Sequence, residues 1–209
     1  AADPTVPFPT TSTATGAGVV VGVLDSGIDY ARADLGGGFG PGFKVRGGYD
    51  FINGDADPMD DNFHGTAVAG IIAADGADYR GLAPRADLLA LKVCDSSGQC
   101  PTSAILEAID WALDPDGTPS TDDAADVLNL SLGSSFGNAD DPVAVALDGA
   151  TAMGTVSVVS AGNDSAPCNT TLDAQADVCR RGVRESVSTS SSLRRVRNDL
   201  QLNLTDQVG

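Results

Sequence analysis

Asp25, His64 and Asn163 are the residues of this sequence whose types and surroundings suit acid–base and nucleophilic chemistry. His64 is the only histidine of the chain, and imidazole is the side chain that exchanges a proton near neutral pH. An isolated Asp and His are more often a core carboxylate and a hydrogen-bonded structural histidine. Here, however, Asp25 ends an apolar segment, His64 precedes a helical pattern, and the Asn163 amide can donate to a developing oxyanion. The three together predict a site for nucleophilic catalysis.

The segments that must position these residues alternate between strand and helix patterns. Apolar runs typical of buried parallel strands lie at 19–24, 88–93, 127–131 and 156–160, and helical patterns lie at 66–74, 103–113 and 142–153. This alternation predicts an α/β fold of three layers, with a mostly parallel central sheet flanked by helices. Ligands of such sheets gather at the carboxyl ends of the strands, so we expect Asp25, Ser131 and Asn163 to share one cleft.

Composition excludes two classes of partner. The 209 residues carry a net charge of −17, which argues against nucleic acid and anionic membrane surfaces as partners. The sequence has no apolar run of eighteen residues, so no segment is expected to span a membrane. With 42% hydrophobic residues the chain can build a sizeable core, as one domain or as one domain and the start of another.

Four cysteines fall into two local pairs, Cys94 with Cys100 and Cys168 with Cys179, each enclosing a short polar segment. Neither spacing is typical of a zinc site, and we predict no metal site from them. Four free thiols in a cytosolic core are the alternative. The polar neighbours favour two disulfides, an oxidising compartment, and therefore a secreted or extracellular protein.

Five sequence blocks resemble those of the subtilisin-like serine proteases, the subtilases. They occur in the family's order over roughly residues 15 to 165: Val23–Asp29, His64–Gly70, Gly81–Pro84, Asn129–Gly133 and Ser160–Asn163. Each block alone is weak, whereas five in order are specific.

The resemblance implies a role for each matching residue. Asp25 would be the triad aspartate, His64 the general base and later the general acid, and Asn163 the donor of the oxyanion hole. The edge of a groove for an extended polypeptide substrate would be formed by Ser131, Leu132, Gly133, Ala161 and Gly162.

The sequence departs from the family at the nucleophile. The family's Gly-Thr-Ser-Met-Ala-x-Pro motif is absent, because Gly-Thr at 65–66, 117–118 and 154–155 is never followed by serine. We therefore expect a serine endopeptidase whose serine lies beyond this chain, so that the chain alone is inactive and the fold is truncated on its C-terminal side. A catalytically inactive peptide-binding module is the alternative. A flavodoxin-like nucleotide binder is disfavoured, because no Gly-rich phosphate loop follows the first strand.

The resemblance also divides the chain. We expect an extended segment at 1–15, a partial catalytic core at 16–165, and a disulfide-bearing tail at 166–209 that would suit the start of an inserted protease-associated domain. Asp34 matches a carboxylate that binds calcium in some subtilases. The loop at 75–80 that would complete this site is short, so we expect no cofactor and regard calcium as doubtful.

Overall fold

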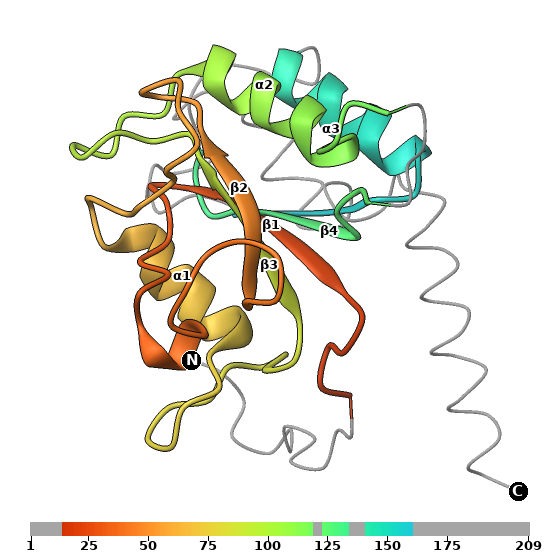
Figure 1. Cartoon of the computed structure of the whole chain (residues 1–209). Coiled ribbons are helices and arrows are strands. Elements are labelled where there is room, and N and C mark those ends of the chain that lie inside the picture. The colour runs from red at the N-terminus through yellow and green to blue at the C-terminus, as the bar shows by residue number, and fades with distance from the viewer. Residues whose placement is uncertain (1–13, 119–122, 134–140, 161–209) are drawn as a thin grey trace, which may run out of the picture.

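A five-stranded, wholly parallel β-sheet forms the centre of the protein (Figure 1). The sequence predicts a mostly parallel sheet and four of these five strands. The computed structural model describes residues 14–118, 123–133 and 141–160. The strand order is β2-β3-β1-β4-β5. The strands are β1 (Val20–Asp25), β2 (Val45–Asp50), β3 (Asp87–Lys92), β4 (Val127–Leu130) and β5 (Val156–Val159), and the helices are α1 (His64–Ala73), α2 (Thr102–Leu113), α3 (Pro142–Ala152) and the 3-10 helix η1 (Ala33–Leu35).

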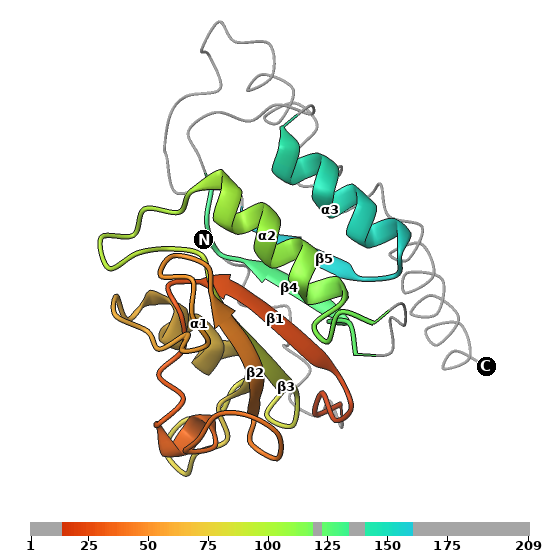
Figure 2. The ribbon, with the colours of Figure 1, turned by 45° about the horizontal axis from the view of Figure 1, so that its top comes forward.

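Helices cover both faces of the sheet, so the predicted three-layer α/β fold is confirmed. Figures 1 and 2 show α2 and α3 lying side by side over one face, with α1 on the opposite face. Each face has its own apolar core. Leu24 packs with α2 and α3 in one core, whereas Val21 and Val23 pack with α1 in the other. Because side chains alternate along a strand, Asp25 lies on the α1 face.

The strand β2 is not predicted from the sequence, because Gly47 and Gly48 interrupt its pattern. A register irregularity between Val45 and Gly47 also breaks the alternation that marks a strand. The glycine at 48 is required by its neighbour, since a Cβ there would lie 2.0 Å from the Ala90 carbonyl oxygen. Pairing with β3 therefore determines this strand more than its own side chains do.

The three helices begin close to the predicted positions. α1 begins at His64 itself, two residues earlier than the pattern indicates. α2 begins at Thr102 behind Pro101, one residue earlier than the pattern indicates. α3 begins at Pro142, and the Asp141 side chain caps it by accepting a hydrogen bond from the Val143 N–H. The helix that matters most for the site is α1, because its first residue is the histidine.

Candidate active site

Asp25 and His64 meet at the carboxyl edge of the sheet. The Asp25 Oδ1 atom lies 2.7 Å from His64 Nδ1, within hydrogen-bond distance. The aspartate side chain is 3% exposed and the histidine side chain 53% exposed. A buried carboxylate on Nδ1 favours the tautomer that carries its proton there, which leaves Nε2 free to accept a proton from a solvent-side group.

Close backbone packing sets the separation of this pair. Gly65, the second residue of α1, lies against the loop that follows β1, and a Cβ on it would be 2.1 Å from the Gly27 carbonyl oxygen. The same Cβ would lie 3.1 Å from the Asp25 Cβ. Because only a residue without a Cβ allows this approach, Gly65 brings the first turn of α1 within reach of Asp25.

Asp60 joins the loop after β1 to the start of α1. Its Oδ1 atom accepts hydrogen bonds from the Ser26 hydroxyl at 2.8 Å and from the Asn62 and Phe63 N–H groups at 2.9 and 3.0 Å. Its Oδ2 atom accepts from both the N–H and the hydroxyl of Thr66. Partial burial raises the pKa of Asp60, but these donors, led by the Thr66 hydroxyl, lower the pKa by more. The ionised carboxylate therefore holds the turn that carries His64.

Phe63 has a left-handed backbone at the residue before the histidine. Its φ is 77°, which is uncommon for a residue other than glycine, and its side chain is 85% exposed. The Phe63 N–H is among the donors to Asp60. The carboxylate of Asp60 thus stabilises a conformation that the sequence alone would not favour.

We expect Asp60→Asn to lower the free energy of unfolding at pH 7 by about 1–2 kcal/mol, a range reduced because the carboxylate is only half-buried. The folded-state pKa of Asp60 lies below the value of 3.8 of an unperturbed aspartate. Its contribution is therefore present above about pH 4 and is lost as the pH falls through the folded-state pKa. Urea unfolding of wild type and variant at pH 7 and pH 3 measures this difference, which should shrink at the lower pH. The exposed Asp110→Asn, on α2, is the control and should show no such difference.

Cys94 and Cys100 form a disulfide beside the site, with Cα atoms 4.1 Å apart. Within the enclosed loop, Asp95 Oδ1 accepts hydrogen bonds from the Ser97 hydroxyl and N–H and from the Gln99 N–H. The loop contacts the segment before His64, because the Asn62 side-chain amide donates to the Ser96 carbonyl oxygen at 2.9 Å. The disulfide therefore supports a loop that borders the candidate site.

Removing this disulfide with Cys94→Ala and Cys100→Ser should lower the free energy of unfolding by about 2 kcal/mol, the value that chain entropy gives for a short closed loop. Urea unfolding of the double variant measures the loss. Wild-type protein unfolded in the presence of a reductant should give the same value. A double variant as stable as the oxidised wild type would show that the hydrogen bonds of Asp95 hold the loop without the disulfide.

Ser131, Leu132 and Gly133 follow β4 at the same edge of the sheet. Leu130, the last residue of β4, accepts a hydrogen bond from the Ser160 N–H at 3.0 Å, and Leu132 accepts one from the Ser160 hydroxyl at 2.8 Å. Leu132 is half-buried against the core, while Gly133 is exposed. Five further sequence-predicted residues lie outside the described part of the chain: Ala161, Gly162, Asn163, Cys168 and Cys179.

Asp34, the residue that matches a calcium-binding carboxylate of some subtilases, is paired with an arginine. The Asp34 carboxylate pairs with the guanidinium of Arg32 through two contacts of 3.0 Å, and this pairing lowers the pKa of Asp34. A cation would have to displace that guanidinium. Among the residues the structure describes, one group of three acidic side chains has carboxylate oxygens within 4.8 Å of one another. These are Asp114, Asp116 and Asp123, which precede β4. An acidic cluster alone does not identify a metal site.

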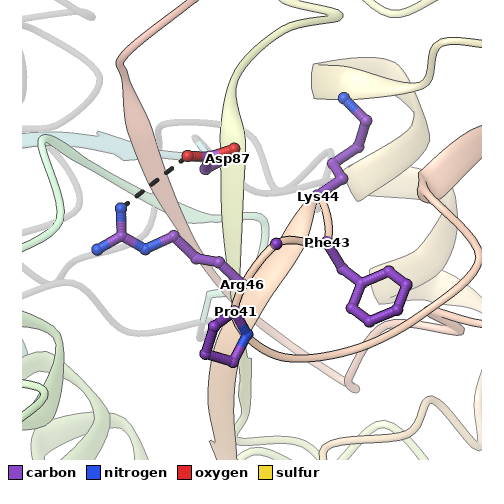
Figure 3. Close-up of a pocket in the computed structure, with 6 residues that line it drawn as sticks. Pro41, Phe43, Lys44, Arg46 and Asp87 are labelled. Atoms are coloured by element: carbon purple, nitrogen blue, oxygen red, sulfur yellow. Dashed lines mark ion pairs between the residues drawn. The ribbon is translucent and has the colours of Figure 1, made fainter.

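A surface hollow lies at the other edge of the sheet, near the amino ends of β2 and β3 (Figure 3). It is lined by Pro41, Gly42, Phe43, Lys44, Arg46 and Asp87. Its charged rim is partly paired, since Arg46 lies 4.0 Å from Asp87. A six-residue strand, about 16 Å long, separates this edge from Asp25 and His64, so the hollow is not part of the candidate active site.

Three residues near the Asp25–His64 pair are not marked by the sequence pattern: Asp60, and the ion pair of Asp61 with Lys92, whose Oδ1 and Nζ atoms lie 2.5 Å apart. Two of them precede His64 by four and three residues, and they resemble an ordinary polar loop. Lys92 lies within an apolar strand, and a lysine flanked by Leu91 and Val93 is the one signal that could have identified it. Lys and Asp are seldom fully buried without a partner, so a charge in an apolar run indicates a specific contact.

Known proteases are similar to this chain in sequence. The sequence model of the subtilase family matches residues 16–192. The minor extracellular protease Vpr of Bacillus subtilis is 39% identical over 158 residues, which are 71% of this chain and 18% of that protein. The serine protease AprX of the same organism is 35% identical over 87% of this chain and 39% of its own length. Subtilisin DY of Bacillus licheniformis is 40% identical over 71% of this chain and 48% of its own.

The fold has a counterpart among solved structures. A cold-adapted subtilisin-like serine proteinase superposes with a TM-score of 0.61 and 32% identity, over 77% of this chain and 53% of that one. The chain thus spans about half or less of the length of the relatives named above. Among the described residues, none of the helices combines the length and apolar character needed to cross a membrane.

Proposed function

This chain belongs to the subtilase family, and from that premise we propose that it forms the Asp–His part of a serine endopeptidase active site. The observation that carries the proposal is the 2.7 Å contact between Asp25 and His64 at the carboxyl edge of a parallel sheet. The sequence has no Gly-Thr-Ser motif and the chain spans less than half of the curated relatives named above, so we propose that the nucleophilic serine lies outside these 209 residues.

The geometry of the pair supports a division of roles. Asp25 is buried and accepts from His64 Nδ1, so it orients the ring and stabilises the imidazolium that forms during reaction. The His64 side chain is 53% exposed, and its other ring nitrogen, Nε2, would act on the substrate side. There it would take the proton of the attacking serine hydroxyl and later deliver that proton to the leaving amine. Asn163 would donate to the oxyanion of the tetrahedral intermediate.

The groove for the polypeptide would run along Ser131, Leu132 and Gly133, and we propose that Ala161 and Gly162 also contact the substrate. An extended peptide can pair with exposed backbone of this kind as an added strand. The space around Gly133 is informative, because a Cβ there would meet the Ser160 hydroxyl at an ordinary 3.9 Å. Packing within the described chain therefore leaves space beside Gly133, and we propose that the substrate backbone approaches there.

An extracellular location agrees with the chemistry of the chain. The Cys94–Cys100 disulfide would persist in an oxidising compartment, and a net charge of −17 suits a soluble protein that avoids nucleic acid and membranes. We propose secretion on these grounds, together with the similarity to a protease described as extracellular.

A catalytically inactive peptide-binding module is the second candidate, favoured by the absence of the serine motif from these 209 residues. The test compares casein hydrolysis by the isolated chain with hydrolysis by a longer protein that contains the residues after 209. Hydrolysis by the longer protein alone supports the protease. Tight binding of an extended peptide by the longer protein, measured calorimetrically and without cleavage, would support the binding module instead.

A further inference from the structure

Lys92 is a buried cation to which the proposed reaction assigns no role. Of the residues that the structure describes, it is the one Lys or Arg that is fully buried, at 1% exposure. It ends β3 in register with Asp25 on β1 and with Asp50 on β2. Leu88 and Ala90 of the same strand face α1, so Lys92 faces α1 as well. The lysine therefore lies on the face of the sheet where Asp25 meets His64.

The ammonium group joins the two loops that carry the Asp–His pair. Lys92 Nζ donates to the Ser26 carbonyl oxygen at 2.8 Å and to Asp61 Oδ1 at 2.5 Å. Ser26 directly follows Asp25, and Asp61 precedes His64 by three residues. One buried side chain thus ties the end of β1 to the segment that leads into α1.

The two carboxylates in register with Lys92, Asp50 and Asp25, differ in how completely they are hydrogen-bonded. Asp50 is satisfied by its own turn, since it accepts from the Ile52 N–H and from the Asn53 N–H and side-chain amide. Asp25 is not: its Oδ1 atom accepts from Ser26 and His64, but its Oδ2 atom is buried and accepts no hydrogen bond from the described residues. A buried carboxylate with an unpartnered oxygen is unfavourable, and a neighbouring positive charge offsets that cost.

We propose that Lys92 is a positioning residue for the Asp25–His64 pair. It holds the main chain on both sides of the pair through Ser26 and Asp61, and its charge compensates the buried Asp25 carboxylate. Asp61 is the ion-pair partner of Lys92 in this arrangement, and its side chain is 49% exposed. The effect on catalysis rests on the proposed function, whereas the effect on geometry does not.

The hydrogen exchange of the His64 ring tests the geometric claim on the 209-residue chain. His64 is the only histidine, so ¹⁵N-histidine labelling gives one set of ring signals. In the wild type we expect a slowly exchanging Nδ1 proton and a single tautomer. Lys92→Met and Asp61→Asn should each accelerate exchange of that proton by about tenfold or more, because the contact with Asp25 then opens more often.

Matched controls separate positioning from general loss of stability or charge. Lys44→Met removes another lysine that donates to a carbonyl oxygen, that of Pro84, but does so at the far edge of the sheet. Asp57→Asn removes an exposed charge from the same loop as Asp61. Both controls should leave the exchange rate of the ring proton unchanged. Asp61→Glu, which keeps a carboxylate, should recover most of the slow exchange.

The outcomes decide the proposal even if Lys92→Met fails to fold. Asp61→Asn alters a half-exposed side chain and leaves Lys92 in place, so we expect this variant to fold. If Lys92→Met does not fold, the exchange rate of Asp61→Asn alone tests the proposal. Faster exchange in Asp61→Asn with unchanged controls supports the proposal. An exchange rate equal to that of the wild type in Asp61→Asn overturns it, as does equal acceleration in the Lys44→Met control.

A kinetic measurement separates this inference from the proposed function. In the longer protein that contains the serine, Asp61→Asn should lower kcat by roughly 10- to 100-fold and change KM by less than about twofold. Faster exchange of the His64 ring proton in Asp61→Asn, together with a wild-type longer protein that has no peptidase activity, would support positioning and contradict the proposed function. Normal activity with unaltered ring exchange in Asp61→Asn would contradict positioning and leave the proposed function standing.

Discussion

We expect His64→Ala to lower kcat for peptide hydrolysis by about 10⁶-fold, and Asp25→Asn by about 10⁴-fold, in the longer protein that contains the nucleophilic serine. The histidine variant loses the base altogether. The asparagine variant keeps the ring but offers an amide in place of the carboxylate whose Oδ1 atom lies 2.7 Å from His64 Nδ1. Steady-state hydrolysis of casein and of a chromogenic peptide measures both effects.

The two losses should not add, because the residues act as one unit. The double variant should be no less active than His64→Ala alone. Asp57→Asn, which removes an exposed charge from the loop before α1, should retain near-wild-type kcat. Far-UV circular dichroism controls for folding. A folded Asp25→Asn variant within about tenfold of the wild type would contradict the assignment of Asp25 as the orienting carboxylate.

The second large effect concerns the nucleophile. A fluorophosphonate probe should label the longer protein and leave the isolated 209-residue chain unlabelled, because the probe reacts with a serine activated by a neighbouring base. His64→Ala in the longer protein should abolish labelling. Gel fluorescence after incubation with the probe measures the difference between the two proteins directly.

Two other results are informative. Labelling of the isolated chain would show that one of its own serines is the nucleophile, and peptide mapping would identify which, beginning with Ser186–Ser192. No labelling of either protein, together with peptide binding, would establish the inactive binding module. In both cases the Asp25–His64 contact would remain, but the proposal that this pair activates a serine outside the 209 residues would be wrong.

Much of the fold follows from local sequence pattern. The runs at 19–24 and 88–93 are apolar on both faces, and only a strand covered on both sides by helices buries them fully. Asp25 directly follows the apolar run at 19–24, which indicates that the strand ends there. An unpaired carboxylate at that position is unfavourable, so the sequence also indicates a hydrogen-bond or ion-pair partner for Asp25. The one histidine of the chain identifies that partner without any structure.

Local pattern was not sufficient for β2 or for the helix starts. Gly47 and Gly48 carry no side chain that could show alternation, and Gly48 is required only because Ala90 of another strand approaches it closely. Ser103 has the chemistry of an N-cap, yet α2 begins one residue earlier behind Pro101. Neighbouring elements override local preference at these positions.

Residue patterns alone were enough to assign the family, to predict the parallel α/β architecture, and to single out Asp25 and His64 as partners. The contacts that hold these two residues together could not be predicted: Asp60 across the start of α1, and Lys92 between Ser26 and Asp61. These contacts join residues that are far apart along the chain. Lys92 is 66 residues from Ser26 and 31 from Asp61, so no local periodicity links them, and their contact exists only after the parallel strands have aligned.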